Sequence, residues 1–118
     1  MTQAELEGAV DGYVAAWNET DPVRRADLLA RSVTEDFEFT GPTGTFRGRE
    51  AVEGLIVALQ TRMAGAVVVR SGPVEGATFP WAIVTAAGAT LLEGLDEVEA
   101  GPDGRLRRIS VAAGTPSA

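Results

Sequence analysis

Residues 77–106 read ATFPWAIVTAAGATLLEGLDEVEAGPDGRL, and this stretch decides the fold class. Apolar and β-branched residues fill it, and two turn signals interrupt it, Gly88 and the GPDG sequence at 101–104. Turn residues between strand-forming runs are typical of hairpins. Together with the flanking sequence they predict a four-stranded antiparallel meander over residues 66–75, 77–87, 89–99 and 105–113.

The sequence before residue 66 has helical periodicity instead. Thr2 and Glu5 have the spacing of a capping box, which predicts the start of a helix. The apolar residues that follow recur at helical spacing: Leu6, Val10, Tyr13, Val14 and Trp17. This pattern predicts a first helix with one buried face.

Two further helices are predicted. Asp21-Pro22 supplies an N-cap and a first helical residue, and this helix should end near Ser32. Its expected apolar residues are Val23, Ala26 and Leu29. Gly48 is expected to cap a third helix that ends near Gly65 and has an apolar stripe of Val52, Leu55, Ile56, Leu59 and Met63.

A short hairpin separates the second helix from the third. Residues 37–40 form a short strand, GPTG at 41–44 is a turn, and residues 45–46 are expected to pair back. The order of elements is therefore helix, helix, hairpin, helix and long meander. This order predicts an α+β fold with the helices packed on one face of a curled sheet.

Composition excludes several kinds of site. The 118 residues fit a single domain, expected over 1–114 with a flexible tail at 115–118. The net charge of -7, with no basic block, argues against a nucleic-acid partner. Cysteine and histidine are absent, which argues against a metal site and removes the commonest general base. We expect no cofactor.

The sequence also favours a soluble, cytoplasmic protein. The N-terminal residues MTQAELEGAV carry two carboxylates and no basic leader, unlike a signal peptide. No apolar run approaches the length of a membrane span, so we expect no membrane partner.

Several of the predicted strands are apolar on both faces. Val67, Val68 and Val69 are consecutive, and so are Leu91 and Leu92. Either loops and the bend of the sheet cover the outer face, or the sheet of a second copy does. We expect a homodimer.

Four segments together resemble the nuclear transport factor two-like superfamily, especially its SnoaL-like polyketide cyclase and ketosteroid isomerase branches. They are DGYVAAWNETD (11–21), VTEDFEFTGPTG (33–44), RGREAV (47–52) and EGLDEVEAGPDGRL (93–106). The resemblance spans residues 4–114. It implies a cone-shaped α+β barrel, in which a strongly curved mixed or antiparallel sheet wraps the three helices and encloses an apolar cavity, and a dimer through the outer sheet face.

The resemblance also implies a catalytic pair. In the isomerase branch a first-helix tyrosine and a late-strand aspartic acid donate hydrogen bonds to the substrate oxygen, and these positions match Tyr13 and Asp96. The apolar site of that isomerase keeps its aspartic acid neutral, so we expect Asp96 to be neutral or hydrogen-bonded if buried. The residues expected to line the cavity are Trp17, Phe39, Gly41, Leu59, Met63, Phe79 and Trp81.

At the third catalytic position, this sequence departs from the pattern of the isomerase branch. The proton-shuttling aspartate precedes a proline, and here that residue is Gly41. Glu38 and Glu93 have the wrong strand parity to replace it, while Glu53 and Gln60 lie at the edge of the third helix's apolar stripe. The sequence therefore contains no clear replacement for the base.

Each candidate site residue also has a purely structural interpretation. Tyr13, Trp17, Phe79 and Trp81 suit an ordinary core, and Asp96 suits a solvated strand. Arg70 and Arg108 are expected to be surface charges, with a cavity guanidinium as the alternative. Two functions follow: a cavity for a hydrophobic carbonyl or phenolic ligand, with isomerase-like or cyclase-like activity if catalytic, or a non-catalytic dimerisation or protein-binding module with a filled interior.

Overall fold

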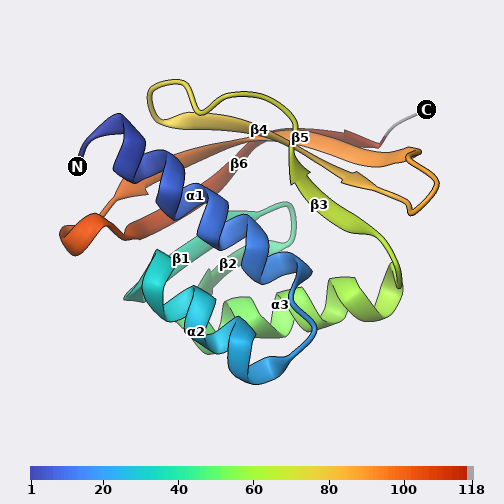
Figure 1. Cartoon of the computed structure of the whole chain (residues 1–118), viewed down its shortest axis with the longest axis horizontal. Coiled ribbons are helices and arrows are strands. Elements are labelled where there is room, and N and C mark those ends of the chain that lie inside the picture. Colours follow the sequence, from blue (N-terminus) through green and yellow to red (C-terminus); the bar gives the residue numbers. More distant parts are fainter. Residues whose placement is uncertain (117–118) are drawn as a thin grey trace.

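The computed structural model describes residues 1–116 and has three helices and six strands in this range (Figure 1). The helices are α1 (Gln3–Asn18), α2 (Pro22–Ser32) and α3 (Arg49–Arg62). The strands are β1 (Val33–Gly41), β2 (Gly44–Arg47), β3 (Val67–Arg70), β4 (Thr78–Val84), β5 (Thr90–Ala100) and β6 (Leu106–Pro116), with a 3₁₀ turn, η1 (Pro102–Gly104), before β6. The predicted order of elements is confirmed.

The helix starts follow the predicted capping signals. Thr2 and Glu5 form a complete capping box at α1, and the Asp21 carboxylate accepts the backbone N–H of Val23 at 2.9 Å at the start of α2. Gly48 is the N-cap of α3 with a φ of 86°, a conformation that glycine adopts without strain. Local sequence therefore determines where each helix begins.

The buried face of α2 differs from the prediction. Val23 is 77% exposed and Ala26 is exposed as well, whereas Arg25 is only 5% exposed and lies beside Leu29 on the inner face. The Arg25 guanidinium can be buried because α1 and α3 supply its hydrogen-bond acceptors. The apolar stripe predicted for α2 was therefore wrong in two of its three residues.

The six strands form one mixed sheet in the order β2-β1-β6-β5-β4-β3. The predicted meander β3 to β6 is antiparallel throughout, while β1 pairs with β6 in parallel. The sheet is an open cone and not a closed barrel, because β2 and β3 remain its two edges. Figure 1 shows α1 lying between strands β4 to β6 and the other two helices.

Several strand boundaries differ from the predicted ranges. The strand expected over residues 66–75 ends at Arg70, because Gly72 and Pro73 follow and Pro73 has no N–H to donate. β1 starts at Val33, directly after α2. β6 continues to Pro116, where Thr115 and Pro116 pair with Glu93 and Leu92, two residues beyond the expected domain boundary. The rest of the predicted tail, residues 117–118, lies outside the described residues.

The core lies between α1 and the inner face of the sheet. Its fully buried side chains include Val10 of α1, Phe37 of β1, Phe79 of β4 and Ile109 of β6. The outer face of the sheet carries both apolar and charged side chains, since Val67 is 40% exposed and Glu93 and Glu97 are exposed. Within residues 1–116 no helix is both long and apolar enough to cross a membrane.

Candidate functional site

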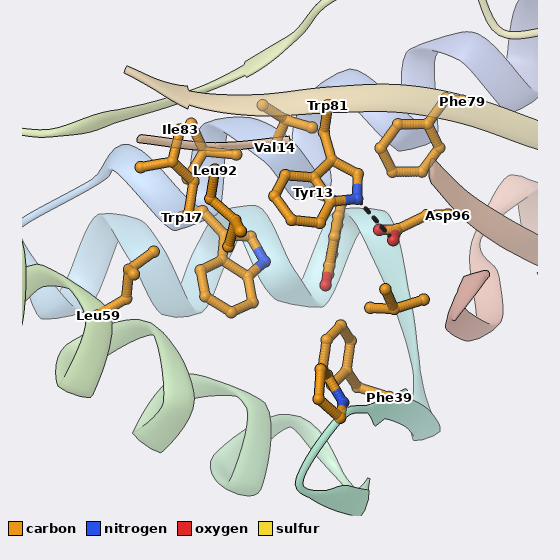
Figure 2. Close-up of a pocket in the computed structure, with 13 residues that line it drawn as sticks. Tyr13, Val14, Trp17, Phe39, Leu59, Phe79, Trp81, Ile83, Leu92 and Asp96 are labelled. Atoms are coloured by element: carbon orange, nitrogen blue, oxygen red, sulfur yellow. Dashed lines mark hydrogen bonds between the residues drawn. The ribbon is translucent and has the colours of Figure 1, made fainter. Parts of the chain in front are cut away.

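A cavity of about 210 Å³ lies between α1, α3, the β1–β2 turn and the inner face of the sheet (Figure 2). Seven of the nine residues predicted for the site line it: Tyr13, Trp17, Phe39, Leu59, Phe79, Trp81 and Asp96. Six other lining residues were not predicted individually: Val14, Pro42, Val68, Ile83, Leu92 and Val111. Strand alternation could have indicated two of them, because Ile83 shares a face of its strand with Trp81 and Leu92 shares one with Asp96.

The cavity has a buried end and a solvent end. Tyr13, Phe79 and Asp96 are almost fully buried, whereas Pro42 in the β1–β2 turn is exposed. Apart from Tyr13, Asp96 and the two indoles, every lining side chain is a hydrocarbon. The two oxygen-bearing groups, those of Tyr13 and Asp96, therefore belong to the most buried part of the lining.

Side chains alternate between the two faces of β5, and this alternation places Asp96 on the face that lines the cavity. In β5, Leu92, Asp96 and Val98 face inward, while Glu93 and Glu97 are exposed on the other face. Asp96 pairs in register with Phe79 of β4, and the indole Nε1–H of Trp81 donates a hydrogen bond to Asp96 Oδ1 at 2.8 Å. The surface role considered for Asp96 is excluded, because its residue is only 5% exposed.

Burial shifts the protonation of Asp96. Removal from water raises the pKa of the Asp96 carboxyl from 3.8 to about 7, and the hydrogen bond from Trp81 partly opposes this rise by stabilising the carboxylate. The described lining residues include no cation that would hold the charge. Asp96 therefore changes its protonation state near neutral pH.

Tyr13 keeps its proton at neutral pH. Burial raises the pKa of the Tyr13 hydroxyl, and the nearby Asp96 charge raises it further. The ring packs edge-on against Trp17, with centroids 6.2 Å apart, and tilted against Phe37 at 5.8 Å. Figure 2 shows its oxygen pointing into the cavity on the same side as Asp96. The hydroxyl is thus placed as a hydrogen-bond donor.

Gly41 and Met63 do not line the cavity. Met63 follows the last residue of α3 and borders a separate surface depression near Thr85. Gly41 ends β1 and pairs with Gly44, and a β-carbon there would lie 2.8 Å from Cε1 of Phe39. The Phe39 ring thus occupies the space into which a side chain at residue 41 would project, and Pro42 lines the cavity instead.

The other candidate charges lie outside the cavity. Glu38 pairs with Arg47 at 2.6 Å and with Arg108 at 3.2 Å on the outer side of the sheet. Arg70 pairs with Asp11 at 2.9 Å and with Glu7 on α1. The prediction that Arg70 and Arg108 are surface charges therefore agrees with their contacts. Among the described lining residues, Asp96 is the one carboxylate.

A buried polar cluster under α1 was not predicted. Arg25 donates to Glu53 at 3.1 Å, to the Glu19 carbonyl at 2.9 Å and to Gln60 Oε1 at 3.3 Å. Gln60 Nε2 in turn donates to the carbonyls of Trp17 at 3.1 Å and Glu19 at 2.9 Å. The cluster fixes the last turn of α1, which carries Trp17, onto α3. In residues 1–116 no group of acidic side chains has the arrangement of a metal site.

No protein-family model and no curated protein matches the chain. Several solved structures do match the chain. A SnoaL-like family protein from Agrobacterium tumefaciens is 24% identical with a TM-score of 0.81, over 98% of this chain and 99% of that one. A protein with a cystatin-like fold from Methylobium petroleophilum is 19% identical with a TM-score of 0.77, over 100% of this chain and 81% of that one.

A third structural neighbour, a SnoaL-like protein from Burkholderia thailandensis, is 20% identical with a TM-score of 0.69, over 96% of this chain and 98% of that one. At these identities the likeness concerns the fold. The α+β cone around α1 and the neighbours that share it confirm the fold that the resemblance implied, and the chain has the nuclear transport factor two-like fold.

Proposed function

We propose that the cavity binds a small apolar molecule that carries a carbonyl or phenolic oxygen, and that Tyr13 and Asp96 contact this oxygen-bearing end. One observation carries the proposal: two oxygen-bearing side chains are buried at the closed end of a cavity whose other walls are apolar and aromatic. Concave, mostly apolar cavities with a few placed polar groups are the usual form of small-molecule sites.

The volume limits the size of the ligand. A dry apolar cavity of about 150 Å³ is large enough for benzene, and sites for drug-sized molecules begin at about 300 Å³. The cavity of about 210 Å³ lies between these values. One ring or two fused rings therefore fit inside, and any larger substituent has to extend through the mouth near Pro42.

The chemistry of the two polar groups suits a carbonyl. A protonated Tyr13 hydroxyl and a neutral Asp96 carboxyl both donate hydrogen bonds, which polarise a carbonyl and stabilise negative charge on its oxygen. A polyketide cyclase activity has been suggested for the structural neighbours from Sinorhizobium meliloti and Jannaschia. An isomerase-like or cyclase-like reaction at this site would also need a proton acceptor, and Gly41 supplies none.

Calorimetric titration with two matched ligands tests the proposal. 2-Tetralone and tetralin have the same two fused rings, and only 2-tetralone has the carbonyl. We expect 2-tetralone to bind more tightly, and Tyr13→Phe to reduce its affinity about 2- to 13-fold, since one hydrogen bond contributes about 0.5 to 1.5 kcal/mol.

Glu93→Gln is the control for Asp96→Asn, because Glu93 lies on the same strand but faces outward. It should leave both affinities unchanged, whereas Asp96→Asn should alter the preference for 2-tetralone. If folded wild-type protein binds neither ligand, the proposal is wrong and the non-catalytic module becomes the better account.

A further inference from the structure

Aromatic rings make up a large part of the cavity wall. Five of the chain's seven aromatic side chains line it: Tyr13, Trp17, Phe39, Phe79 and Trp81. The face of an aromatic ring carries partial negative charge, so a group of rings attracts organic cations in addition to accepting hydrocarbons. The walls of the cavity therefore suit a positively charged organic ligand as well as a neutral one.

The carboxyl group of Asp96 has one oxygen without a partner. The indole N–H of Trp81 donates to Oδ1 at 2.8 Å. The second oxygen, Oδ2, accepts no hydrogen bond from the described residues and keeps some surface open to the cavity. No arginine lies among the described lining residues. Oδ2 is therefore available to a donor that a ligand supplies.

Aromatic side chains surround the Asp96 carboxyl group. Phe79 is its cross-strand neighbour in β4, Trp81 donates to it, and Tyr13 is close enough for the Asp96 charge to raise the pKa of the Tyr13 hydroxyl. Figure 2 shows these three rings beside the carboxyl group. A cation bound at Oδ2 would therefore lie next to aromatic rings as well as to the carboxylate.

The burial of Asp96 favours a charged partner. An unpaired carboxylate in an apolar cavity is unfavourable, and burial accordingly raises the pKa of Asp96 to about 7. The folded protein already bears the desolvation of this group, so the binding of a cation adds only the desolvation of the ligand. The opposite charge then stabilises the carboxylate, and the rings stabilise the cation. The net charge of -7 also favours the approach of cations.

We propose that the cavity also binds organic ammonium ions, with the ammonium group hydrogen-bonded to Asp96 Oδ2 and the hydrocarbon part among the aromatic rings. This ligand class goes beyond the carbonyl and phenolic one proposed above, although it uses the same cavity. A primary ammonium group has three N–H donors and no acceptor, which suits a carboxylate oxygen without a partner. The cavity volume of about 210 Å³ again limits the hydrocarbon part to one ring or two fused rings.

2-Aminotetralin tests the inference. It has the two fused rings of tetralin and an alkylamine that, like the amine of lysine, is protonated below a pH of about 10. At pH 8, calorimetric titration should show tighter binding of 2-aminotetralin than of tetralin. Asp96→Asn should weaken 2-aminotetralin binding about 13- to 160-fold, the range for one hydrogen bond to a charged group, and should not weaken tetralin. Glu93→Gln is the control, because Glu93 is exposed on the other face of β5 and its loss should change neither affinity.

The pH dependence of binding gives a readout that needs no variant. Tyr13 on α1 is the one other titratable side chain among the described lining residues, and its raised pKa keeps it neutral in this range. The lining side chains of α3, the β1–β2 turn, β3, β4 and β6 do not titrate. An ammonium ion requires the ionised carboxylate, so the affinity for 2-aminotetralin should rise by up to about tenfold per pH unit below the Asp96 pKa of about 7 and level off above it.

The outcomes separate this inference from the proposed function. If 2-tetralone binds but 2-aminotetralin binds no more tightly than tetralin at pH 8, the ammonium inference is wrong while the proposed function stands. Equal affinities of wild type and Asp96→Asn for 2-aminotetralin, or an affinity that does not rise between pH 5 and pH 7, would overturn the inference as well. If 2-aminotetralin binds through Asp96 and 2-tetralone does not bind, the ammonium inference stands and the carbonyl function fails.

Discussion

Replacing Asp96 with asparagine should stabilise the folded protein above pH 7. Asparagine has nearly the shape of aspartic acid, and its side-chain carbonyl can still accept the Trp81 N–H. The substitution removes only the ionisation of a side chain that is 5% exposed in an apolar cavity. Its effect on stability should therefore depend on pH in a way that follows from the Asp96 pKa.

The sign and size follow from the two protonation states. The folded-state pKa is about 7 and the ordinary value is 3.8, so between these values the folded protein keeps a proton that the unfolded chain has released. The stability of the wild type therefore falls as pH rises through this window. One pKa unit corresponds to about 1.4 kcal/mol, which gives a loss of about 4 kcal/mol by pH 7 and above.

Urea unfolding of wild type and Asp96→Asn from pH 4 to pH 8.5 measures this contribution. The difference between the two free energies of unfolding cancels the other carboxylates, which both proteins share. We expect the difference to grow in favour of Asp96→Asn by about 4 kcal/mol across the window. A difference that does not change with pH would mean that Asp96 is solvated, and the cavity chemistry described above would be wrong.

Four further outcomes are expected. Trp81→Phe removes the donor that stabilises the Asp96 carboxylate, so the pKa of Asp96 should rise above its wild-type value of about 7 in a ¹³C NMR titration. A lower Asp96 pKa in this variant would contradict the hydrogen bond between Trp81 and Asp96. Arg25→Met should lower the free energy of unfolding by about 2 to 3 kcal/mol in urea, because it removes three hydrogen bonds and takes their donor away from the Glu53 carboxylate and Gln60 Oε1, while the neighbouring exposed Arg24→Met should change it by less than about 0.5 kcal/mol. Gly41→Ala should cost about 1 kcal/mol and weaken 2-tetralone binding, since the added β-carbon displaces the Phe39 ring; unchanged affinity in a folded variant would show that the ring does not move into the cavity. Light scattering at micromolar concentration should give a dimer that Val67→Asp converts to monomer, because Val67 is exposed and alternates along β3 with Val68, which faces the cavity; a wild-type monomer would refute this.

The helices and the meander could be predicted because their signals are local. The capping box at Thr2 and Glu5, the Asp21-Pro22 pair and Gly48 each act within a few residues, and each marks the observed helix start. Strand alternation likewise groups Asp96 with Leu92 on one face, although it cannot tell which face is inside. The fold supplies that information by placing α1 against one side of the sheet.

The wrong or missing predictions concern residues whose surroundings are set by segments far away in the sequence. Arg25 is buried because Glu53 and Gln60, which lie far along the chain, supply acceptors, and no pattern within α2 indicates this. The parallel pairing of β1 with β6 joins opposite ends of the chain. The family resemblance pointed to Gly41, but the structure places Phe39 and Pro42 at the cavity there, since a glycine offers no side chain.

A crystal structure of the protein grown with saturating 2-tetralone would show whether the cavity binds a ketone through Tyr13. We expect the two rings inside the cavity between α1 and the sheet, with the ketone oxygen within hydrogen-bond distance, about 3 Å, of the Tyr13 hydroxyl at the buried end. A cavity closed by its own side chains, or a ligand bound with its oxygen directed to solvent near Pro42, would contradict it.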